Sequence, residues 1–275
     1  MGKLNFILVF FTCLAAAFGS KGQTDSTIHL SQQQLIQGDF TNFYIDNLGN
    51  IYLLNANNQI KKINDKGDSV AVANALKRFG DIYSMDVSNS LKVVVYYKDF
   101  TTIVVLDRFL KNVNTIDLRK YGILQARSVA ISYDNNYWVF DEVENKLKKI
   151  DDYGNMLLST PDLRMVFGES FLPEKIIDYN GYVYLYNKIK GCKIFDYYGA
   201  LKQSISLPDQ NNIQLFKNSI LGFADSTIHV YDISVFTEHS YLLDPQVNNA
   251  LKLQKLLNSL YVLKRDGLYI YAINN

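Results

Sequence analysis

The sequence predicts an all-β fold, a six-bladed β-propeller with four-stranded antiparallel blades and a ring closed by an N-terminal strand. The first observation is a strand-and-turn unit that recurs roughly every 40 residues, the period of propeller blades. The second is composition, because 20 Tyr and 16 Phe stand against only 4 Pro, and aromatic residues favour strands. The third is that the last unit lacks one strand while the N-terminal region holds an unused one.

Two landmarks define the repeat. One is the turn between the first two strands of a unit, and the other is the residue that ends the third strand. The turns fall at Gly49, Asn89, Asn135, Asn180, Asn218 and Asn258. The strand ends fall at Asn64, Asp107, Asp151, Asp196, Asp232 and, in degenerate form, Ala272. Gly, Asn and Asp tolerate the left-handed backbone that tight hairpin turns need, so both landmarks are physically meaningful.

The repeat divides the chain into six units in order. They cover residues 41–75, 81–118, 125–162, 172–207, 212–244 and 251–275. The third unit predicts strands at 128–133, 137–143, 147–151 and 156–159. The fourth predicts strands at 175–178, 182–186, 193–195 and 201–207. These runs are rich in aromatic and β-branched residues and are bounded by turn residues, as expected of antiparallel strands.

The sixth unit ends before its fourth strand. Its expected strands are 251–257, 260–263 and 268–273. The stretch Thr27 to Leu30 reads as a strand with no partner in its own neighbourhood. We therefore expect it to become the outer strand of the last blade, because ring closure removes two open sheet edges.

The N-terminus predicts an export signal. Lys3 is followed by an apolar run from Leu4 to Ala17 and then by small residues, which is typical of a signal peptide over residues 1–22. The run is too short for a convincing membrane span. A lipid anchor through Cys13 is an alternative that we do not favour, since small residues do not precede it. Residues 23–275 are expected to form one propeller domain.

The repeat strings carry a family resemblance. Residues 45–53 (IDNLGNIYL), followed by 59–64 (QIKKIN) and Gly67, resemble NHL-type repeats of six-bladed propellers, and residues 131–154 and 177–199 are similar. The other three units have lost the glycines. The export signal and the bias toward Asn, Lys, Tyr and Ile resemble exported Bacteroidetes envelope proteins that contain such propellers. The resemblance implies a fold and a binding role, but no ligand.

Composition and motifs argue against several functions. A net charge of +1 gives no electrostatic case for nucleic acid or an anionic membrane surface. The chain has only 3 His, and it lacks zinc-binding His spacing, a Gly-x-Ser-x-Gly turn and a phosphate-binding glycine loop. We expect a non-enzyme with no catalytic residues, no metal site and no cofactor. Cys192, alone after signal cleavage, is expected to be a packed core residue.

Acidic residues recur along the repeat. The inner strands offer Asp46, Asp86, Asp178 and the cation Lys175, and Asp107, Asp151, Asp196 and Asp232 end third strands. Such residues usually cap turns by accepting hydrogen bonds from nearby amides. The alternative is a calcium site, because hard cations prefer carboxylates. Trp138, the single tryptophan, is expected to pack between blades.

The connections between blades supply a candidate binding surface, because loops on a rigid scaffold often have functional roles. The longest and most apolar connection covers residues 163–172, and those at 77–80 and 119–124 are expected on the same face. Arg, Met and aromatic residues are typical of interface centres. The candidate interface residues are Arg78, Phe79, Tyr121, Arg164, Met165, Phe167 and Phe171. The alternative is that Met165, Val166 and Phe171 fill the gap between two blades.

The leading hypothesis is a non-enzymatic protein-interaction module of the cell envelope. It would be an accessory subunit of a periplasmic or outer-membrane complex and would bind another envelope protein. The alternative is a metal-dependent hydrolase or lyase acting at the mouth of the propeller channel, with ligands that converge from several inner strands.

Overall fold

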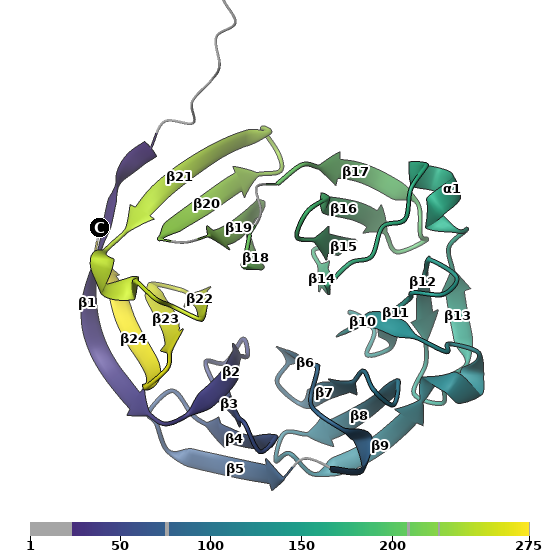
Figure 1. The fold of residues 1–275 in the computed structure, drawn as a ribbon, viewed down its shortest axis with the longest axis horizontal. Helices are drawn as coiled ribbons and strands as arrows, with labels where there is room; N and C mark the ends of the chain where they lie inside the picture. Colours follow the sequence, from purple (N-terminus) through teal and green to yellow (C-terminus); the bar gives the residue numbers. More distant parts are fainter. Residues whose placement is uncertain (1–23, 75–76, 208–209, 225, 275) are drawn as a thin grey trace, which may run out of the picture.

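The computed structural model describes residues 24–74, 77–207, 210–224 and 226–274. The predicted signal peptide, with Cys13, lies outside these residues. The strands form four four-stranded sheets and one eight-stranded sheet, arranged around a common centre (Figure 1). The all-β prediction with four-stranded antiparallel sheets is confirmed.

Each four-stranded sheet is a meander in which consecutive strands pair antiparallel. The first contains β2 (Phe40–Ile45), β3 (Ile51–Asn55), β4 (Gln59–Ile63) and β5 (Ser69–Asn74). The second contains β6 (Ser84–Asn89), β7 (Lys92–Tyr97), β8 (Thr102–Asp107) and β9 (Asn112–Asp117). The third contains β10 (Ala126–Ile131), β11 (Tyr137–Asp141), β12 (Lys146–Ile150) and β13 (Met156–Ser159). The fourth contains β14 (Lys175–Tyr179), β15 (Tyr182–Asn187), β16 (Gly191–Asp196) and β17 (Leu201–Ile205).

The eight-stranded sheet joins the C-terminal strands to the N-terminal one. One side contains β18 (Asn212–Phe216), β19 (Ser219–Ala224), β20 (Thr227–Asp232) and β21 (Thr237–Leu243). The other contains β22 (Lys252–Leu256), β23 (Ser259–Lys264) and β24 (Gly267–Asn274). Between β21 and β24 lies β1 (Thr24–Gln37).

The strand β1 explains why hydrogen bonding gives five sheets where the sequence predicted six separate blades. Its stretch His29–Gln37 pairs antiparallel with β24, and its first residues pair parallel with β21. An N-terminal strand therefore does pair with the last strand, as predicted. The pairing with β24 begins at His29, whereas Thr27 and Ile28 pair with Leu242 and Leu243 instead. A strand of 14 residues is long enough to form hydrogen bonds with both β21 and β24.

Short helical turns connect consecutive sets of strands. They are η1 (Lys77–Phe79), η2 (Leu118–Tyr121), α1 (Leu163–Phe167) and η3 (Pro245–Val247). α1 begins after Asp162, whose side chain accepts a hydrogen bond from Arg164 N, and ends at Gly168 with a φ of 71°. A left-handed residue at this position ends a helix sharply, and glycine adopts it without strain. None of the helices among the described residues is long and apolar enough to cross a membrane.

Apolar clusters fill the spaces between neighbouring sets of strands. Six such clusters are present in the described part of the chain, and each draws on strands from both sides of a gap. Between the third and fourth sheets, Trp138 and Phe140 meet Val183, Leu185 and Phe195. Full burial of one such aromatic side chain contributes about 2 kcal/mol, so these interfaces supply most of the stability.

Side chains also tie each innermost strand to the next. Figure 1 places β2, β6, β10, β14, β18 and β22 nearest the centre. The links are Met85 N to Tyr44 Oη (3.2 Å), Ile131 N to Asp86 Oδ2 (2.8 Å), Tyr133 N to Asp178 Oδ2 (3.1 Å), Lys175 Nζ to Ile213 O (2.7 Å), Asn212 Nδ2 to Leu253 O (3.0 Å) and Lys252 Nζ to Phe43 O (2.6 Å). The inner strands are thus joined by polar contacts as well as by the apolar clusters.

Candidate functional site

An exposed apolar surface forms around α1. It brings together the β11–β12 turn, α1 with the loop that follows it, and the β15–β16 turn. Leu163 N donates to Asn145 O at 2.9 Å, and Lys190 Nζ donates to Ser170 O at 2.6 Å, which holds the three segments side by side. We call the exposed side chains Val143, Met165, Val166 and Ile189 the α1 surface; Met165 and Ile189 are 85% and 86% exposed.

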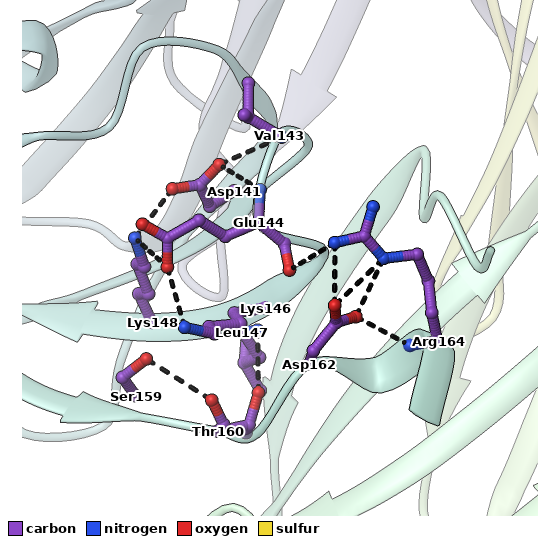
Figure 2. A network of polar contacts seen from close by, with 10 residues as sticks. All are labelled: Asp141, Val143, Glu144, Lys146, Leu147, Lys148, Ser159, Thr160, Asp162 and Arg164. Atoms are coloured by element: carbon purple, nitrogen blue, oxygen red, sulfur yellow. Dashed lines mark hydrogen bonds and ion pairs between the residues drawn. The ribbon is translucent and has the colours of Figure 1, made fainter. Parts of the chain in front are cut away.

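A buried ion pair supports the turn that presents Val143 (Figure 2). Lys148 Nζ lies 2.6 Å from Asp141 Oδ2 and 3.2 Å from Glu144 Oε2, and the Lys148 and Asp141 side chains are almost fully buried. Asp141 Oδ1 accepts hydrogen bonds from the backbone of Val143 and Glu144. Loss of either partner would leave an uncompensated buried charge. A conformation of the turn that separates Asp141 from Lys148 is therefore unfavourable.

Charged side chains border the α1 surface. Arg164 makes two short contacts to Asp162, at 2.9 Å and 2.7 Å, and also reaches Glu144 O at 3.5 Å (Figure 2). Lys146 lies 2.8 Å from Glu144, and hydrogen bonds from Lys146 and Lys148 lower the pKa of Glu144 below its usual range. An apolar centre inside a polar rim is the usual anatomy of a protein interface.

The structure brings together only some of the predicted interface residues. Arg164 and Met165 lie on α1 and are exposed. Phe167 is half-buried and lies 5.7 Å from the Phe171 ring in an edge-to-face contact. Phe171 is 1% exposed and belongs to the apolar cluster between the third and fourth sheets. For Phe171 the alternative of gap filling is correct, because its ring is enclosed by residues of both sheets.

The other predicted residues lie elsewhere. Arg78 is exposed over the ring of Phe79, which packs against Tyr97 in the second sheet. The Tyr121 ring packs on the β12–β13 turn at Gly154, whereas α1 contacts the β11–β12 turn. These turns lie at opposite ends of β12, so the Tyr121 ring does not join the α1 surface. The backbone of η2 agrees with the expected common face, because Leu118 N donates to Thr101 O in the β7–β8 turn as Leu163 N donates to Asn145 O in the β11–β12 turn.

The recurring aspartates at the strand ends are turn caps. Asp107, Asp151 and Asp196 each accept hydrogen bonds from the backbone amides two and four residues ahead, at 2.8–3.0 Å. Asp46 does the same through Oδ1 and also accepts from Tyr52 Oη through Oδ2. The structural interpretation is confirmed for these residues. No group of three or more His, Cys, Asp or Glu side chains fit for a metal occurs among the described residues.

His229 does not form a catalytic triad with its polar neighbours. His229 Nδ1 lies 3.2 Å from Glu238 Oε1 and 3.0 Å from Ser240 Oγ. A triad needs the nucleophile and the acid on different ring nitrogens. Cys192 is fully buried and unpaired, and burial raises the pKa of its thiol to about 12. It is a packed core residue, as predicted. The reactive form of cysteine is the thiolate, and the raised pKa keeps this thiol protonated.

Asp178 organises an aromatic group beside the channel. It accepts hydrogen bonds from Trp138 Nε1 at 2.9 Å and Tyr197 Oη at 2.5 Å. The Tyr197 ring stacks on Tyr133 with centroids 4.3 Å apart, and Lys149 Nζ lies 5.0 Å from the Trp138 ring centroid. Trp138 is fully buried, which confirms its predicted packing role.

The centre of the molecule contains a cavity of about 630 Å³ lined by residues of the inner strands. Lys175 Nζ donates to Asn212 Oδ1 (3.1 Å) and Ile213 O (2.7 Å), and burial lowers the pKa of Lys175 to about 8. Lys252 Nζ donates to Asn42 Oδ1 (2.8 Å) and Phe43 O (2.6 Å). Burial and the charge of Lys175 hold the pKa of Lys252 well below its ordinary value.

Sequence reasoning identified Lys175 on an inner strand but missed Lys252 and Gln210. The alternation of side chains along β22 could have indicated Lys252, because Lys252 and Gln254 lie on one side of the strand and Leu253 lies on the other. Gln210 lies between strands, where no periodicity marks a buried side chain.

Known proteins resemble this chain in fold. No family model matches the chain, and no curated protein matches it. Among solved structures, the WD40 domain of Pan2 from Neurospora crassa has a TM-score of 0.65 at 10% identity, covering 92% of this chain and 97% of that one. A streptogramin B lyase has a TM-score of 0.59 at 16% identity, covering 84% and 78%.

A third similar structure is BamB from Moraxella catarrhalis, with a TM-score of 0.54 at 11% identity, covering 89% of this chain and 100% of that one. The chain therefore has a β-propeller fold. Similarities at this level of identity concern the fold alone, and they include both a lyase and proteins not named as enzymes. Function therefore has to be argued from the residues of this chain.

Proposed function

We propose that this protein is a non-enzymatic protein-interaction propeller of the cell envelope, an accessory subunit that binds another envelope or outer-membrane protein. The observation that supports this most is the α1 surface. Four exposed apolar side chains from three separate segments gather there inside a charged rim. Exposed apolar clusters with polar rims are characteristic of interaction sites.

We propose further that the propeller has six blades in one domain over residues 23–275, preceded by a signal peptide over residues 1–22. In this view the eight-stranded sheet is two blades joined by β1. The six apolar clusters and the links between inner strands, including Lys252 to Phe43, support this count. The NHL-like character and the Bacteroidetes envelope origin rest on the sequence strings alone.

The geometry favours a partner that presents an apolar segment flanked by charges of both signs. Arg164 and Lys190 provide positive charge at the rim, and Glu169 provides negative charge. These pairs are exposed and contribute little to stability on their own. Their exposure leaves them able to exchange partners on docking, which mainly affects orientation and association rate.

Site-specific photo-crosslinking tests the proposal. A photoreactive phenylalanine analogue replaces Met165 in the full chain, expressed in its own cells, and adducts are identified after irradiation. A matched control places the same analogue at Phe236, which is 65% exposed on the β20–β21 turn. We expect one dominant adduct with an envelope protein from position 165 and none from position 236.

Two results would count against the proposal. One is a monomer with no adduct at position 165, and the other is the same adducts at both positions, which marks random collision. A Met165→Asp variant that folds normally yet still recovers the partner would exclude the α1 surface. The alternative, a metal-dependent hydrolase or lyase, needs ligands converging at the channel mouth, and no observation in the described residues favours it.

A further inference from the structure

The central cavity contains two lysines with no carboxylate partner. Lys175 and Lys252 come from β14 and β22, and in the described part of the chain each ammonium bonds only an amide oxygen and a backbone carbonyl. An ammonium has three N–H donors, so one donor on Lys175 is left over, whereas Lys252 also has the Tyr44 ring 4.0 Å from its Nζ. A charge removed from water without a counterion is costly, and an anion between the lysines would offset that cost.

The nearest acidic side chain is already engaged. Asp86 lies close enough to act on the charge of Lys175, but it accepts hydrogen bonds from Ile131 N and Ser88 N, both at 2.8 Å. Asp178, the other inner-strand carboxylate lining the cavity, accepts from Ser132, Tyr133, Trp138 and Tyr197. These carboxylates hold neighbouring strands together, and Glu174, which also lines the cavity, accepts from Lys188 N at 2.7 Å. The charge of Asp86 acts on Lys175 from a distance, but no ion pair joins either lysine to a carboxylate among the described residues.

A buried amide near the cavity also has no partner, but it is enclosed by the protein. Gln210 is 1% exposed, and neither Nε2 nor Oε1 has a hydrogen-bond partner among the described residues. Its side chain lies against Gly222, where an added Cβ would come within 2.5 Å of Gln210 Cγ. A buried amide normally finds partners for both its donor and its acceptor. The two atoms are closed off from solvent by this packing, so a ligand in the cavity would not reach them, and the anion site has to rest on the two lysines.

The rest of the lining is largely apolar. Met85, Val87, Ile177 and Leu215 face the same space, with the Tyr44 ring 4.0 Å from Lys252 Nζ. A volume of about 630 Å³ is in the range of small-molecule sites. We propose that the channel binds a small organic anion whose carboxylate lies between Lys175 and Lys252 and whose body contacts the apolar wall. This inference does not depend on the proposed protein partner.

Calorimetric titration of the purified mature chain tests the site. The probes are phenylacetate and succinate, with inorganic phosphate for comparison, all at constant ionic strength and pH 7. We expect one-to-one saturable binding of a carboxylate probe, with a matching rise in Tm. Lys175→Met and Lys252→Met should each weaken binding by about tenfold or more, because each removes a charge-assisted hydrogen bond. Lys111→Met, which changes an exposed lysine of the second sheet, should bind as the wild type does.

A variant that leaves both lysines in place keeps the test informative if the lysine variants fail to fold. Gln254→Glu keeps the shape of a half-buried side chain that lines the cavity and adds a negative charge, so it should weaken probe binding by about three- to tenfold. Three outcomes would overturn the proposal: no saturable binding of any probe, unchanged affinity in a folded Lys175→Met/Lys252→Met protein, or phosphate binding as tightly as the organic carboxylates.

Discussion

The two sides of the channel wall join their inner strands with groups of opposite charge. Around β10 the links are carboxylates, because Asp86 accepts from Ile131 N and Asp178 accepts from Tyr133 N. Around β18 and β22 the links are ammonium groups, because Lys175 donates to Ile213 O and Lys252 donates to Phe43 O. Carboxylates and ammonium groups therefore both connect neighbouring inner strands.

The difference lies in what each link leaves unsatisfied. A carboxylate can accept several N–H and O–H donors, and Asp178 is surrounded by four of them. Each lysine donates only to neutral acceptors, and neither has a carboxylate partner among the described residues. We infer that the carboxylate side is purely structural, whereas the lysine side is prepared for an anion. The following predictions separate these two roles.

The largest expected effect is on the carboxylate side. Asp178→Ala should lower the free energy of unfolding by about 3 kcal/mol, because it leaves the buried indole N–H of Trp138 and the hydroxyl of Tyr197 without their acceptor. Urea denaturation of the mature protein measures the loss. Asp178→Asn is the control and should lose less, since its amide oxygen still accepts. A loss below about 1 kcal/mol for the alanine variant would show that Asp178 is not a structural centre.

The lysine side should respond to pH. The pKa of Lys175 falls from 10.5 in the unfolded chain to about 8 in the folded one, so the folded state holds fewer protons between these values. Stability contributed by Lys175 is therefore lowest below pH 8 and rises toward pH 10.5. The charged groups lining the same cavity are Asp86, Glu174, Asp178, Lys188 and Lys252.

The measurement is the unfolding free energy of the wild type minus that of Lys175→Met. Between pH 7 and pH 10 this difference should increase by about 2 kcal/mol, because the variant removes the titration of Lys175. The variant also raises the pKa of Lys252, since the charge of Lys175 is gone, and this change acts in the same direction. The variant's own pH dependence corrects for the tyrosines that titrate in the same range. A difference that stays flat or decreases would mean that Lys175 is not desolvated.

Much of the fold could be predicted because it depends on local signals. Turn residues such as Asn135 and Gly49 adopt positive φ, as their chemistry allows, and they mark the hairpins at the predicted places. The joining of two sets of strands through β1 could not be predicted, because it depends on how far the N-terminal strand extends past β24 to reach β21. Sequence period gives the number of units but not how their edges hydrogen-bond.

The candidate sites were less accessible to sequence reasoning. The composition of residues 163–172 correctly indicated an exposed Met165, yet it could not separate this residue from Phe171, which is buried a few positions later. The channel lysines belong to strands far apart in sequence, and their unpaired state follows only from seeing which carboxylates are already engaged. The burial of the Gln210 amide follows only from its packing against Gly222, which the sequence does not indicate.

A smaller effect should come from the other carboxylate link. Asp86→Ala removes the acceptor for Ile131 N, a partly buried donor, and for Ser88 N, which is exposed and can bond water instead. We expect a loss of about 1 kcal/mol in thermal or urea unfolding, less than for Asp178→Ala. Asp86→Asn should recover much of it. A loss equal to that of Asp178→Ala would mean that Asp86 does more than link β6 to β10.

The smallest expected effect tests whether the carboxylates have capacity for a cation. Both oxygens of Asp46 are occupied, since Oδ1 accepts from Leu48 N and Asn50 N and Oδ2 accepts from Asn50 Nδ2 and Tyr52 Oη. A calcium ion would have to displace these donors and open the turn. Adding calcium or EDTA should therefore change the Tm of the mature protein by less than about 1 °C. A rise of several degrees in Tm with stoichiometric calcium would show that carboxylates of this molecule bind a metal. The carboxylate side would then not be purely structural, and the alternative of a metal-dependent enzyme acting at the channel mouth would be favoured.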